Sequence, residues 1–299
     1  MSGRDSTAAA SPKIATVIVN YGAADMVIDH FPALKAECEA FPGSRVYIVD
    51  NASPGDDGAK LAGFAAGEPL VFFIQGKENG GFAQGNNIAL RQILAAPEPF
   101  DYIFLLNPDA FPRPGALRAL TDFLASRPDA WLAGARLETV DGAPHVSAFR
   151  YFSIFSEFDW GANTGFVSTL LSAWRVAPPQ KDETSEADWL CAAALLIRPE
   201  VFKDAGLFDE RYFLYYEETD LMLGARRAGW PSWYVPAARA VHYEGSSTGV
   251  KNTAEIKPQP NYWYRSRAYY YRKNHGALYA AVADLAWMSG ALFYLARVC

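Results

Sequence analysis

The sequence has few cysteines, and none lies in a pattern that would hold a disulfide framework or a zinc ion. Cys38, Cys191 and Cys299 are the three cysteines among 299 residues, and no C-x-x-C spacing links them. Scattered single cysteines are typical of a reducing compartment, and structural zinc sites need clustered ligands. We therefore expect an intracellular protein without a structural zinc site.

The N-terminus lacks an apolar segment, and the chain as a whole lacks an excess of positive charge. Residues 1–13 are small and polar, so they match no signal peptide, and we expect a disordered tail there. The net charge of −6 and the isoelectric point near 5.3 argue against nucleic acid as a partner. These absences predict a cytoplasmic protein that binds no nucleic acid.

The composition is that of a globular protein. A hydrophobic share of 51% with 20% charged residues excludes disorder, and the length suits one large α/β domain with an appendage. Aromatic residues make up 14%, and many of them follow residue 150. They suit a sugar-binding cleft or a membrane-facing surface, and they suit a thick core equally well.

Short apolar runs alternate with helical stretches in the first half of the chain. We expect strands at 14–19, 45–49, 70–74 and 102–106, and helices at 23–40, 82–94 and 114–126. Continuous apolar strands that alternate with helices predict a mostly parallel sheet covered by helices on both faces. In such sheets, ligands bind beyond the carboxyl ends of the strands.

A polar, turn-prone cluster follows each of these four strands. The clusters are Asn20-Tyr21-Gly22, Asp50-Asn51-Ala52-Ser53, Asn79-Gly80-Gly81-Phe82 and Asn107-Pro108-Asp109. Asn, Asp and Gly are also ordinary turn residues, which is the alternative explanation for any single cluster. Four clusters in succession, all at carboxyl ends, favour a nucleotide site at one edge of the sheet.

An acidic cluster opens a predicted helix in the second half. Glu217-Glu218-Thr219-Asp220 lies at the start of the helix expected at 218–228. Before this helix we expect an apolar run at 189–197 and a short helix at 200–205, and after it strands at 233–235 and 239–241. Acids favour helix N-termini in any protein, whereas a carboxylate at this place also suits a general base. Because neighbouring helical side chains point about 100° apart, one of Glu217 and Glu218 can face the reacting atoms.

Two residues far apart in sequence are candidates to bind a hard divalent cation. Asp109 lies at the tip of the turn after the fourth strand, and His242 follows the last predicted strand. A carboxylate and a neutral imidazole can hold Mg²⁺ or Mn²⁺, which would neutralise charge on a diphosphate leaving group. Either residue alone is more often structural.

The C-terminal region differs from the rest of the chain. Residues 262–275 combine six aromatic residues with Arg265, Arg267, Arg272 and Lys273, and residues 277–296 are nearly all apolar apart from Asp284. A basic-aromatic belt before an apolar helix is typical of an interfacial membrane anchor. A helix packed against the domain or against a second copy in a homodimer is the alternative.

The ordered clusters resemble the inverting glycosyltransferases of family 2, and within that family the rhamnosyltransferase-like branch. The resemblance rests on Asp50 to Ser53, Asn79 to Ala83 with Asn86-Asn87, Leu106 to Asp109, Gly206 to Glu210, Tyr216 to Leu221, Arg227 to Trp230 and His242. It covers residues 14–247. It implies a GT-A fold with a catalytic domain at 14–250, of which 14–110 is the nucleotide-binding half and 111–250 the acceptor and catalytic half, followed by a helical region at 251–299.

The resemblance also implies roles for individual residues. Asp50 and Asn51 match positions that meet the base or ribose, and Asn79, Gly81, Phe82 and Asn86 match the loop over the nucleotide. The clusters at the strand ends add Asn20, Tyr21 and Asn107, the last of which replaces the first acid of the family's D-x-D-type sequence. Asp109 and His242 match the metal ligands. Glu218 matches the catalytic base, with Glu217 as a competitor.

One departure from the family's pattern concerns the sugar. Trp189-Leu190-Cys191-Ala192 stands where relatives often carry a small Ser-Gly pair, and we expect Trp189 to lie with Asp220 near the donor or acceptor sugar.

The resemblance implies a metal-dependent hexosyltransferase. Its donor would be a dTDP- or UDP-sugar, with dTDP-rhamnose as the first choice, and its acceptor a hydroxyl of a glycan or lipid-linked saccharide in cell-surface polysaccharide synthesis. The enzyme would work on the inner face of the plasma membrane.

Two other classes stay open at this point. A non-catalytic nucleotide-sugar-binding or membrane scaffold protein is one of them. A dinucleotide-dependent oxidoreductase is the other, although Asn20-Tyr21-Gly22-Ala23 does not supply the glycine pattern that it needs.

Overall fold

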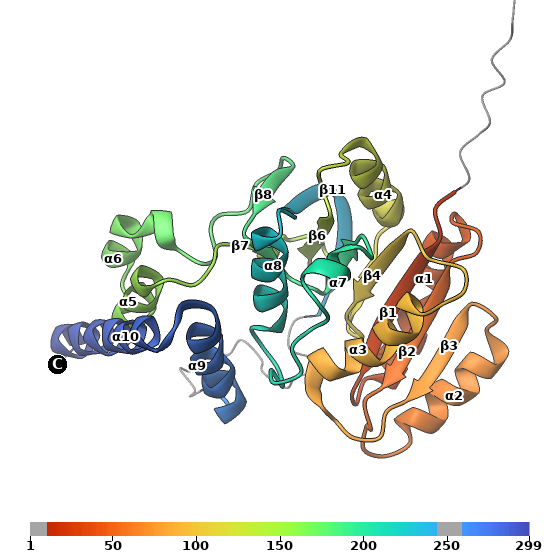
Figure 1. Ribbon diagram of the computed structural model, residues 1–299, viewed down its shortest axis with the longest axis horizontal. Coiled ribbons are helices and arrows are strands. Elements are labelled where there is room, and N and C mark those ends of the chain that lie inside the picture. Colours follow the sequence, from red (N-terminus) through yellow and green to blue (C-terminus); the bar gives the residue numbers. More distant parts are fainter. Residues whose placement is uncertain (1–10, 244–258, 299) are drawn as a thin grey trace, which may run out of the picture.

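The computed structural model describes residues 11–243 and 259–298 of the chain (Figure 1). Most of the tail predicted at 1–13 and the predicted boundary at residue 250 lie outside these ranges. Lys13 lies inside them, and here the prediction of disorder is wrong. Its N–H donates to Asp101 at 2.7 Å and its ammonium pairs with Glu98 at 2.7 Å, so this residue is fixed against the start of the fourth strand.

A parallel four-stranded sheet forms the first half, as the sequence predicts. The strands are β1 (Ile14–Asn20), β2 (Arg45–Asp50), β3 (Val71–Gln75) and β4 (Tyr102–Leu106). They lie side by side in the order β3-β2-β1-β4. All three neighbouring pairs are parallel, so their carboxyl ends meet at one edge.

The sheet continues through the second half with a change of direction. Strand β10 (Ala194–Ile197) runs antiparallel between β4 and β6 (Leu132–Glu138). Strand β11 (Ser232–His242) lies parallel to β6, and the short strands β5 (Ala110–Pro112) and β8 (Ser185–Ala187) pair with it. A separate pair joins β7 (Ala148–Phe149) to β9 (Trp189–Leu190).

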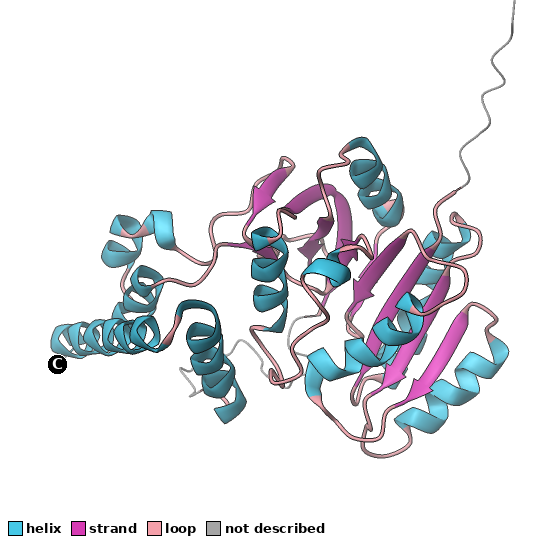
Figure 2. Ribbon diagram, in the orientation of Figure 1, coloured by secondary structure: helices cyan, strands magenta, loops and turns pink. Residues whose placement is uncertain are grey.

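Helices cover both faces of the sheet (Figure 2). Helices α1 (Ala24–Glu39), α2 (Asp57–Gly67) and α4 (Ala116–Ser126) pack one face, where Leu34, Leu61 and Leu120 are buried. Helices α3 (Gly81–Leu94), α7 (Val201–Asp204) and α8 (Glu217–Arg227) pack the other, with Leu90, Val201 and Met222. Burial on both faces explains why the strands read as unbroken apolar runs.

A helical lobe projects from the sheet domain (Figure 1, left). It consists of α5 (Ile154–Ala162), α6 (Gly165–Leu170), the short 3₁₀ turn Ser172–Trp174 and α10 (Ala277–Val298), and α9 (Asn261–His275) joins it to the domain. Helices α5 and α10 cross closely at Gly161 and Gly290. A Cβ at Gly290 would lie 2.4 Å from the Phe158 carbonyl oxygen, so the crossing requires a residue without a side chain.

Several predicted boundaries need correction. Helix α4 begins at Ala116, because Gly115 before it adopts φ +85°, so Pro114 lies outside the helix. The two strands expected at 233–235 and 239–241 form the single strand β11, whose register shifts between Val235 and Arg239. The apolar run expected at 189–197 divides into β9 and β10.

Candidate functional site

Asp50 is the centre of a hydrogen-bond network at the carboxyl ends of β1 and β2. Asn20 donates to its Oδ1 at 2.9 Å, the Ser53 hydroxyl donates to the same oxygen at 2.6 Å, and Gln75 donates to Oδ2 at 2.8 Å. Burial alone would raise the pKa of Asp50, but these donors outweigh it and hold the pKa below its ordinary value. The carboxylate therefore stays charged, and it fixes the strand ends against each other.

Asn51 links the second strand to the loop before α3. Its amide Nδ2 donates to Asn79 Oδ1 and to the Gly81 carbonyl oxygen, both at 3.0 Å. The side chain is buried, and its Oδ1 finds no hydrogen-bond partner within the described ranges. A buried acceptor without a partner is costly unless a ligand or water supplies the donor.

A cavity of about 370 Å³ opens at this edge of the sheet. Its lining comes from the ends of β1, β2 and β4, the start of α3, the loop before α8 and the first turn of α9. The lining residues are Val19, Tyr21, Asn51, Asn79, Gly81, Phe82, Asn107, Pro108, Phe213, Leu214 and Tyr262. Six predicted nucleotide-binding residues thus line one cavity, at the place where α/β sheets bind ligands.

The remaining predicted nucleotide-binding residues support this cavity without lining it. Asn20 and Asp50 lie behind it in the network of the strand ends. Asn86 is buried in α3, and its Nδ2 donates to the Phe82 carbonyl oxygen at 2.9 Å, which holds the first turn of that helix.

The loop before α8 is fixed to the loop before α3. The Phe82 amide donates to the Phe213 carbonyl oxygen at 3.0 Å, and Gly81 adopts φ +82° at the contact. A Cβ at Gly81 would lie 1.7 Å from that same oxygen. Further along the same loop, after Leu214, Tyr215 and Tyr216 adopt φ +69° and +72°. Left-handed backbone in bulky residues is strained, and such strain clusters at functional sites.

Glu217 and Glu218 open helix α8, as predicted, and they differ in exposure. Glu217 is 3% exposed, and burial together with the neighbouring charge of Glu218 raises its pKa well above the ordinary value. Glu218 is partly exposed, and burial raises its pKa to about 7. The pair therefore places a protonated carboxyl beside one that loses its proton near neutral pH.

Asp109 and His242 come together because β5 pairs with the end of β11. In that pairing Ala110 lies opposite His242, and Asp109 Oδ1 lies 3.3 Å from His242 Nε2. The Asn107 amide lies 3.3 Å from the same ring nitrogen. Neighbouring ligands of an octahedral ion with bonds of about 2.1 Å lie about 3.0 Å apart, so the separation fits joint binding of one cation.

Asp109 and His242 cannot complete a coordination shell by themselves. No group of three or more His, Cys, Asp or Glu residues that could hold a metal ion occurs within 11–243 and 259–298. Magnesium is often held by one or two carboxylates together with substrate phosphates and waters. The residues therefore suit a cation that is shared between the protein and a diphosphate. Gly245, Ser246 and Ser247 follow His242, and by their sequence their backbone N–H groups and hydroxyls suit the oxygens of a diphosphate, but they lie outside the described residues.

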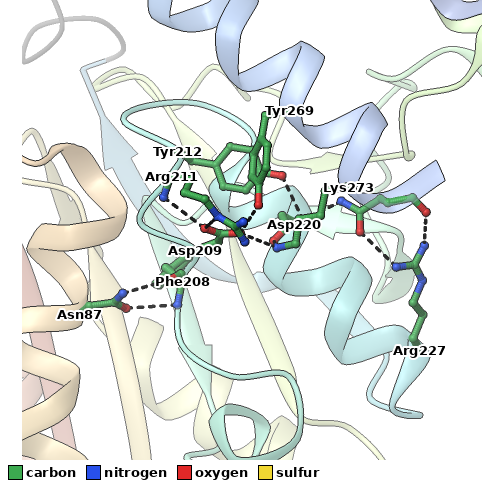
Figure 3. A network of polar contacts seen from close by, with 10 residues as sticks. Asn87, Phe208, Asp209, Arg211, Tyr212, Asp220, Arg227, Tyr269 and Lys273 are labelled. Carbon is green, nitrogen blue, oxygen red and sulfur yellow. Dashed lines mark hydrogen bonds and ion pairs between the residues drawn. The ribbon is translucent and has the colours of Figure 1, made fainter. Parts of the chain in front are cut away.

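Asp220 is bonded to residues of α9 (Figure 3), and it is not among the residues that line the cavity. Tyr212 donates to its Oδ1 at 3.1 Å, Asn274 donates to the same oxygen at 2.6 Å, and Lys273 pairs with Oδ2. Lys273 also contacts Asp209 at 2.8 Å. These bonds tie helix α8 to α9, and a contact of Asp220 with a sugar stays a prediction.

Trp189 packs inside the domain. Its ring stacks on Phe149 with centroids 4.1 Å apart, and its indole N–H donates to the Arg150 carbonyl oxygen at 2.9 Å. Phe152 lies between this ring and Tyr216, at centroid distances of 6.0 and 4.7 Å. The position of Trp189 near a sugar also stays a prediction.

Four residues that line the cavity were not predicted as site residues: Val19, which was expected only as the end of a strand, and Phe213, Leu214 and Tyr262. Phe213 and Leu214 directly precede the acidic cluster, which was the available signal. Tyr262 begins the basic-aromatic stretch that we assigned to a membrane belt. In the structure, its ring lies 5.5 Å from Phe213.

These features define an α/β protein with a cavity at the carboxyl ends of its parallel strands, close to the Asp109–His242 pair. The chain belongs to glycosyltransferase family 2: the family described as "Glycosyltransferase like family 2" matches residues 12–265, which include the cavity, the acid pair and the Asp109–His242 pair. The predicted family is confirmed, and the oxidoreductase alternative falls away.

Two characterised relatives are rhamnosyltransferases. The chain is 32% identical over 218 residues to N-acetylglucosaminyl-diphospho-decaprenol L-rhamnosyltransferase of Mycobacterium tuberculosis (strain CDC 1551 / Oshkosh), covering 68% of each chain. It is 27% identical over 231 residues to rhamnosyltransferase WbbL of Escherichia coli K12, covering 76% of this chain and 82% of the relative.

Solved structures show the same fold at low sequence identity. Mannosyltransferase PcManGT from Pyrobaculum calidifontis, in complex with GDP-Man and Mn²⁺, matches with a TM-score of 0.54 at 14% identity, covering 94% of this chain and 76% of that one. S. aureus TarS 1-349, in complex with UDP-GlcNAc, matches with a TM-score of 0.56 at 13% identity, covering 95% and 72%. The chain thus has the predicted GT-A fold and is a glycosyltransferase.

Proposed function

We propose that this glycosyltransferase is an inverting rhamnosyltransferase that transfers a 6-deoxyhexose from a dTDP- or UDP-sugar to a saccharide linked by diphosphate to a polyprenol. The named activities of the two relatives support the sugar, and the name of the mycobacterial relative supports the acceptor. The product would serve the synthesis of a cell-surface polysaccharide.

The donor would bind in the cavity at the carboxyl ends of the strands. Asn51 Oδ1 is a buried acceptor without a partner in the described part of the chain, and it would accept a hydrogen bond from the nucleotide. Asp109 and His242 would hold Mg²⁺ or Mn²⁺, which when bound neutralises charge on the departing diphosphate.

Glu218 would act as the general base. It removes the proton from the acceptor hydroxyl, whose oxygen then attacks the anomeric carbon from the face opposite the nucleotide. The carbon–oxygen bond to the diphosphate breaks, and the nucleoside diphosphate leaves. The observation that carries this assignment is the difference in exposure, because Glu218 is partly exposed whereas Glu217 is buried. Burial raises the pKa of Glu218 to about 7 and that of Glu217 well above its ordinary value, which favours Glu218 as the carboxylate of the pair.

The enzyme would work at the inner surface of the plasma membrane. Ala277–Arg297 is the stretch of the described chain that is long and apolar enough to cross a membrane, and 17% of its most apolar window is buried. Apolar residues on its exposed face would enter the interfacial layer of the bilayer.

Thermal unfolding with UDP, dTDP, GDP and NAD, each with and without Mn²⁺, tests the donor site. We expect UDP or dTDP to raise the unfolding midpoint in a manner that depends on Mn²⁺, because a ligand that binds the folded state stabilises it. Asp109→Asn should remove the dependence on metal. Stabilisation by GDP or NAD alone would contradict the proposed donor class.

A further inference from the structure

Helix α9 contacts the loop that leads into the helix of the proposed base. Ser266 donates its hydroxyl to the Leu214 carbonyl oxygen at 3.0 Å. The ring of Trp263 lies 5.7 Å from that of Tyr216, and the ring of Tyr270 lies 5.3 Å from it. The loop before α8 is therefore held by α9 as well as by the loop before α3.

The backbone of this loop needs such support. Tyr215 and Tyr216 adopt left-handed conformations directly before the acid pair, and bulky residues keep that backbone only where their surroundings fix it. The Asp220 amide donates to the Tyr216 carbonyl oxygen at 2.8 Å and closes the first turn of α8. Glu218 lies inside that turn, so a contact that holds Asp220 also fixes the position of the proposed base.

Lys273 binds Asp220 from α9 (Figure 3). Its ammonium pairs with Asp220 Oδ2 and lies 2.8 Å from Asp209 Oδ2, so it bridges the first turn of α8 and the segment before it. The Lys273 side chain is 31% exposed, and those of Asp209 and Asp220 are 11% and 8% exposed. Charge-assisted hydrogen bonds among groups so well shielded from water are stronger than those at an open surface.

The two aspartates differ in what else holds them. Arg211 donates to both carboxylate oxygens of Asp209, at 2.7 and 2.8 Å, so this carboxylate keeps a cation without Lys273. Asp220 also accepts hydrogen bonds from two neutral side chains, but within the described ranges it pairs with no cation other than Lys273. A buried carboxylate without its cation is costly, so loss of Lys273 should displace the first turn of α8.

We propose that Lys273 is a positioning residue for the transfer reaction, which acts on Glu218 through Asp220. The ion pair holds the first turn of α8 against α9, and that turn presents Glu218 to the acceptor hydroxyl. Lys273 does not line the donor cavity, so it contributes to the rate of transfer and not to donor binding. The inference rests on the proposed function, because it takes Glu218 as the base.

Lys273→Met tests the inference, because methionine keeps much of the aliphatic stem and removes the charge. Lys273→Arg keeps the charge, and the double variant Asp220→Asn with Lys273→Met removes both charges of the pair. Lys60→Met is the matched control, since Lys60 also bridges two aspartates, Asp25 at 3.0 Å and Asp56 at 3.6 Å, and its side chain is 37% exposed. It belongs to α2, which packs on the opposite face of the sheet from α8.

Steady-state kinetics with dTDP-rhamnose and N-acetylglucosaminyl-diphospho-polyprenol in detergent micelles measure the effect on transfer. We expect Lys273→Met to lower kcat by about 10–100-fold, because a small displacement of a catalytic group has a cost of this order. The KM for the donor and the thermal shift produced by dTDP with Mn²⁺ should stay at their wild-type values. Lys273→Arg should restore most of kcat, and Lys60→Met should keep it. The double variant should lose no more than Lys273→Met, because both changes break the same contact.

Hydrogen exchange of the free enzyme follows the first turn of α8 without any substrate. The amides of residues 217–221 should exchange several-fold faster in Lys273→Met than in the wild type, because the turn opens more often once the ion pair is lost. The amides of β4, in the core of the sheet, should exchange at the wild-type rate. Lys273→Arg and Lys60→Met should match the wild type in both segments.

The outcomes separate this inference from the proposed function. If Lys273→Met leaves either kcat or the exchange of residues 217–221 unchanged, Lys273 does not position Glu218, although the proposed function stands as long as Glu218→Gln loses activity. Losses that multiply in the double variant would show that Lys273 does not act through Asp220. If Glu218→Gln keeps the wild-type kcat, or the wild type transfers nothing to this acceptor, the proposed function fails and the role of Lys273 fails with it.

Discussion

Two adjacent glutamates with the same chemistry occupy different environments. Helical geometry predicted that one of them could face the reacting atoms, but it could not say which, because burial depends on how the preceding loop packs. In the structure, Tyr215 and Tyr216 adopt left-handed backbone directly before Glu217, which is buried, and Glu218 stays partly exposed. No propensity in the sequence predicts that backbone for two tyrosines.

Glu218→Gln should lower kcat by about 10²–10⁴-fold, the usual contribution of a general base, because the amide cannot accept the proton of the acceptor hydroxyl. The thermal shift produced by dTDP with Mn²⁺ should be kept, since the side chain does not line the donor cavity. Glu217→Gln is the matched control: it replaces a carboxyl that is already protonated and should cost much less activity. The opposite ranking of the two variants would identify Glu217 as the base.

The pH dependence of kcat/KM for the acceptor should show an acidic limb near pH 7, because this ratio reports the pKa values of the free enzyme. The base works as a carboxylate, and burial raises the pKa of Glu218 to about 7, so kcat/KM should fall as the pH drops through that value. Rates at low acceptor concentration between pH 3.5 and 9 would show the limb, and Glu217→Gln should keep it. A limb at about pH 4.3, the ordinary pKa of a glutamate, would contradict the raised pKa of Glu218.

At the scale of elements, the sequence predicted the helices and strands whose buried residues recur with a regular apolar period. The four strands of the parallel half and helices α1, α3 and α8 appear close to their expected bounds, because apolar periodicity marks them. Helix α2, the short strand β5 and helices α5 and α6 were missed. Strand β5 has three residues, and it exists because it pairs with β11, a tertiary contact without a local signal.

Gly81 lies where the loop before α3 contacts the loop before α8, and we expect it to tolerate substitution poorly. Gly81→Ala places a Cβ 1.7 Å from the Phe213 carbonyl oxygen and forces alanine to φ +82°, so the loops before α3 and α8 must separate. We expect a lower unfolding midpoint and the loss of stabilisation by dTDP with Mn²⁺. Calorimetric scans with and without the nucleotide would measure both effects.

Gly63→Ala in α2 is the control for Gly81→Ala. No atom lies within 4 Å of a Cβ at Gly63, and the residue is inside a helix. Alanine there should stabilise the protein by about 0.5–1 kcal/mol through helix propensity. An unchanged nucleotide response in Gly81→Ala would show that the contact between the two loops is dispensable for donor binding.

At the scale of the whole molecule, the sequence predicted a C-terminal helix and placed it at a membrane or against protein. The structure shows that one face of α10 packs on α5 and that the other face is exposed, and contact of the exposed face with a membrane stays a prediction. Its acidic residue Asp284 pairs with Arg267 at 2.6 Å, so that charge belongs to the joint with α9. The sequence could not predict the lobe, since α5 and α10 are separated by more than a hundred residues.

The exposed face of α10 gives a last prediction, for the double variant Leu285→Gln and Leu292→Gln. Both leucines are more than half exposed, so their replacement leaves the packing on α5 intact. Moving a leucine from water into an apolar layer is worth about 1.5–3 kcal/mol, so the double variant should bind vesicles of phosphatidylglycerol and phosphatidylethanolamine at least about tenfold more weakly in sedimentation assays. Val140→Gln, at an exposed site after β6, should bind as the wild type does.

Because the donor cavity lies on the sheet domain, the thermal shift that dTDP with Mn²⁺ produces in the double variant should not change. Activity on an acceptor in micelles should fall less than activity on an acceptor in vesicles. Equal vesicle binding by the double variant and the wild type would mean that this face meets another protein chain rather than lipid.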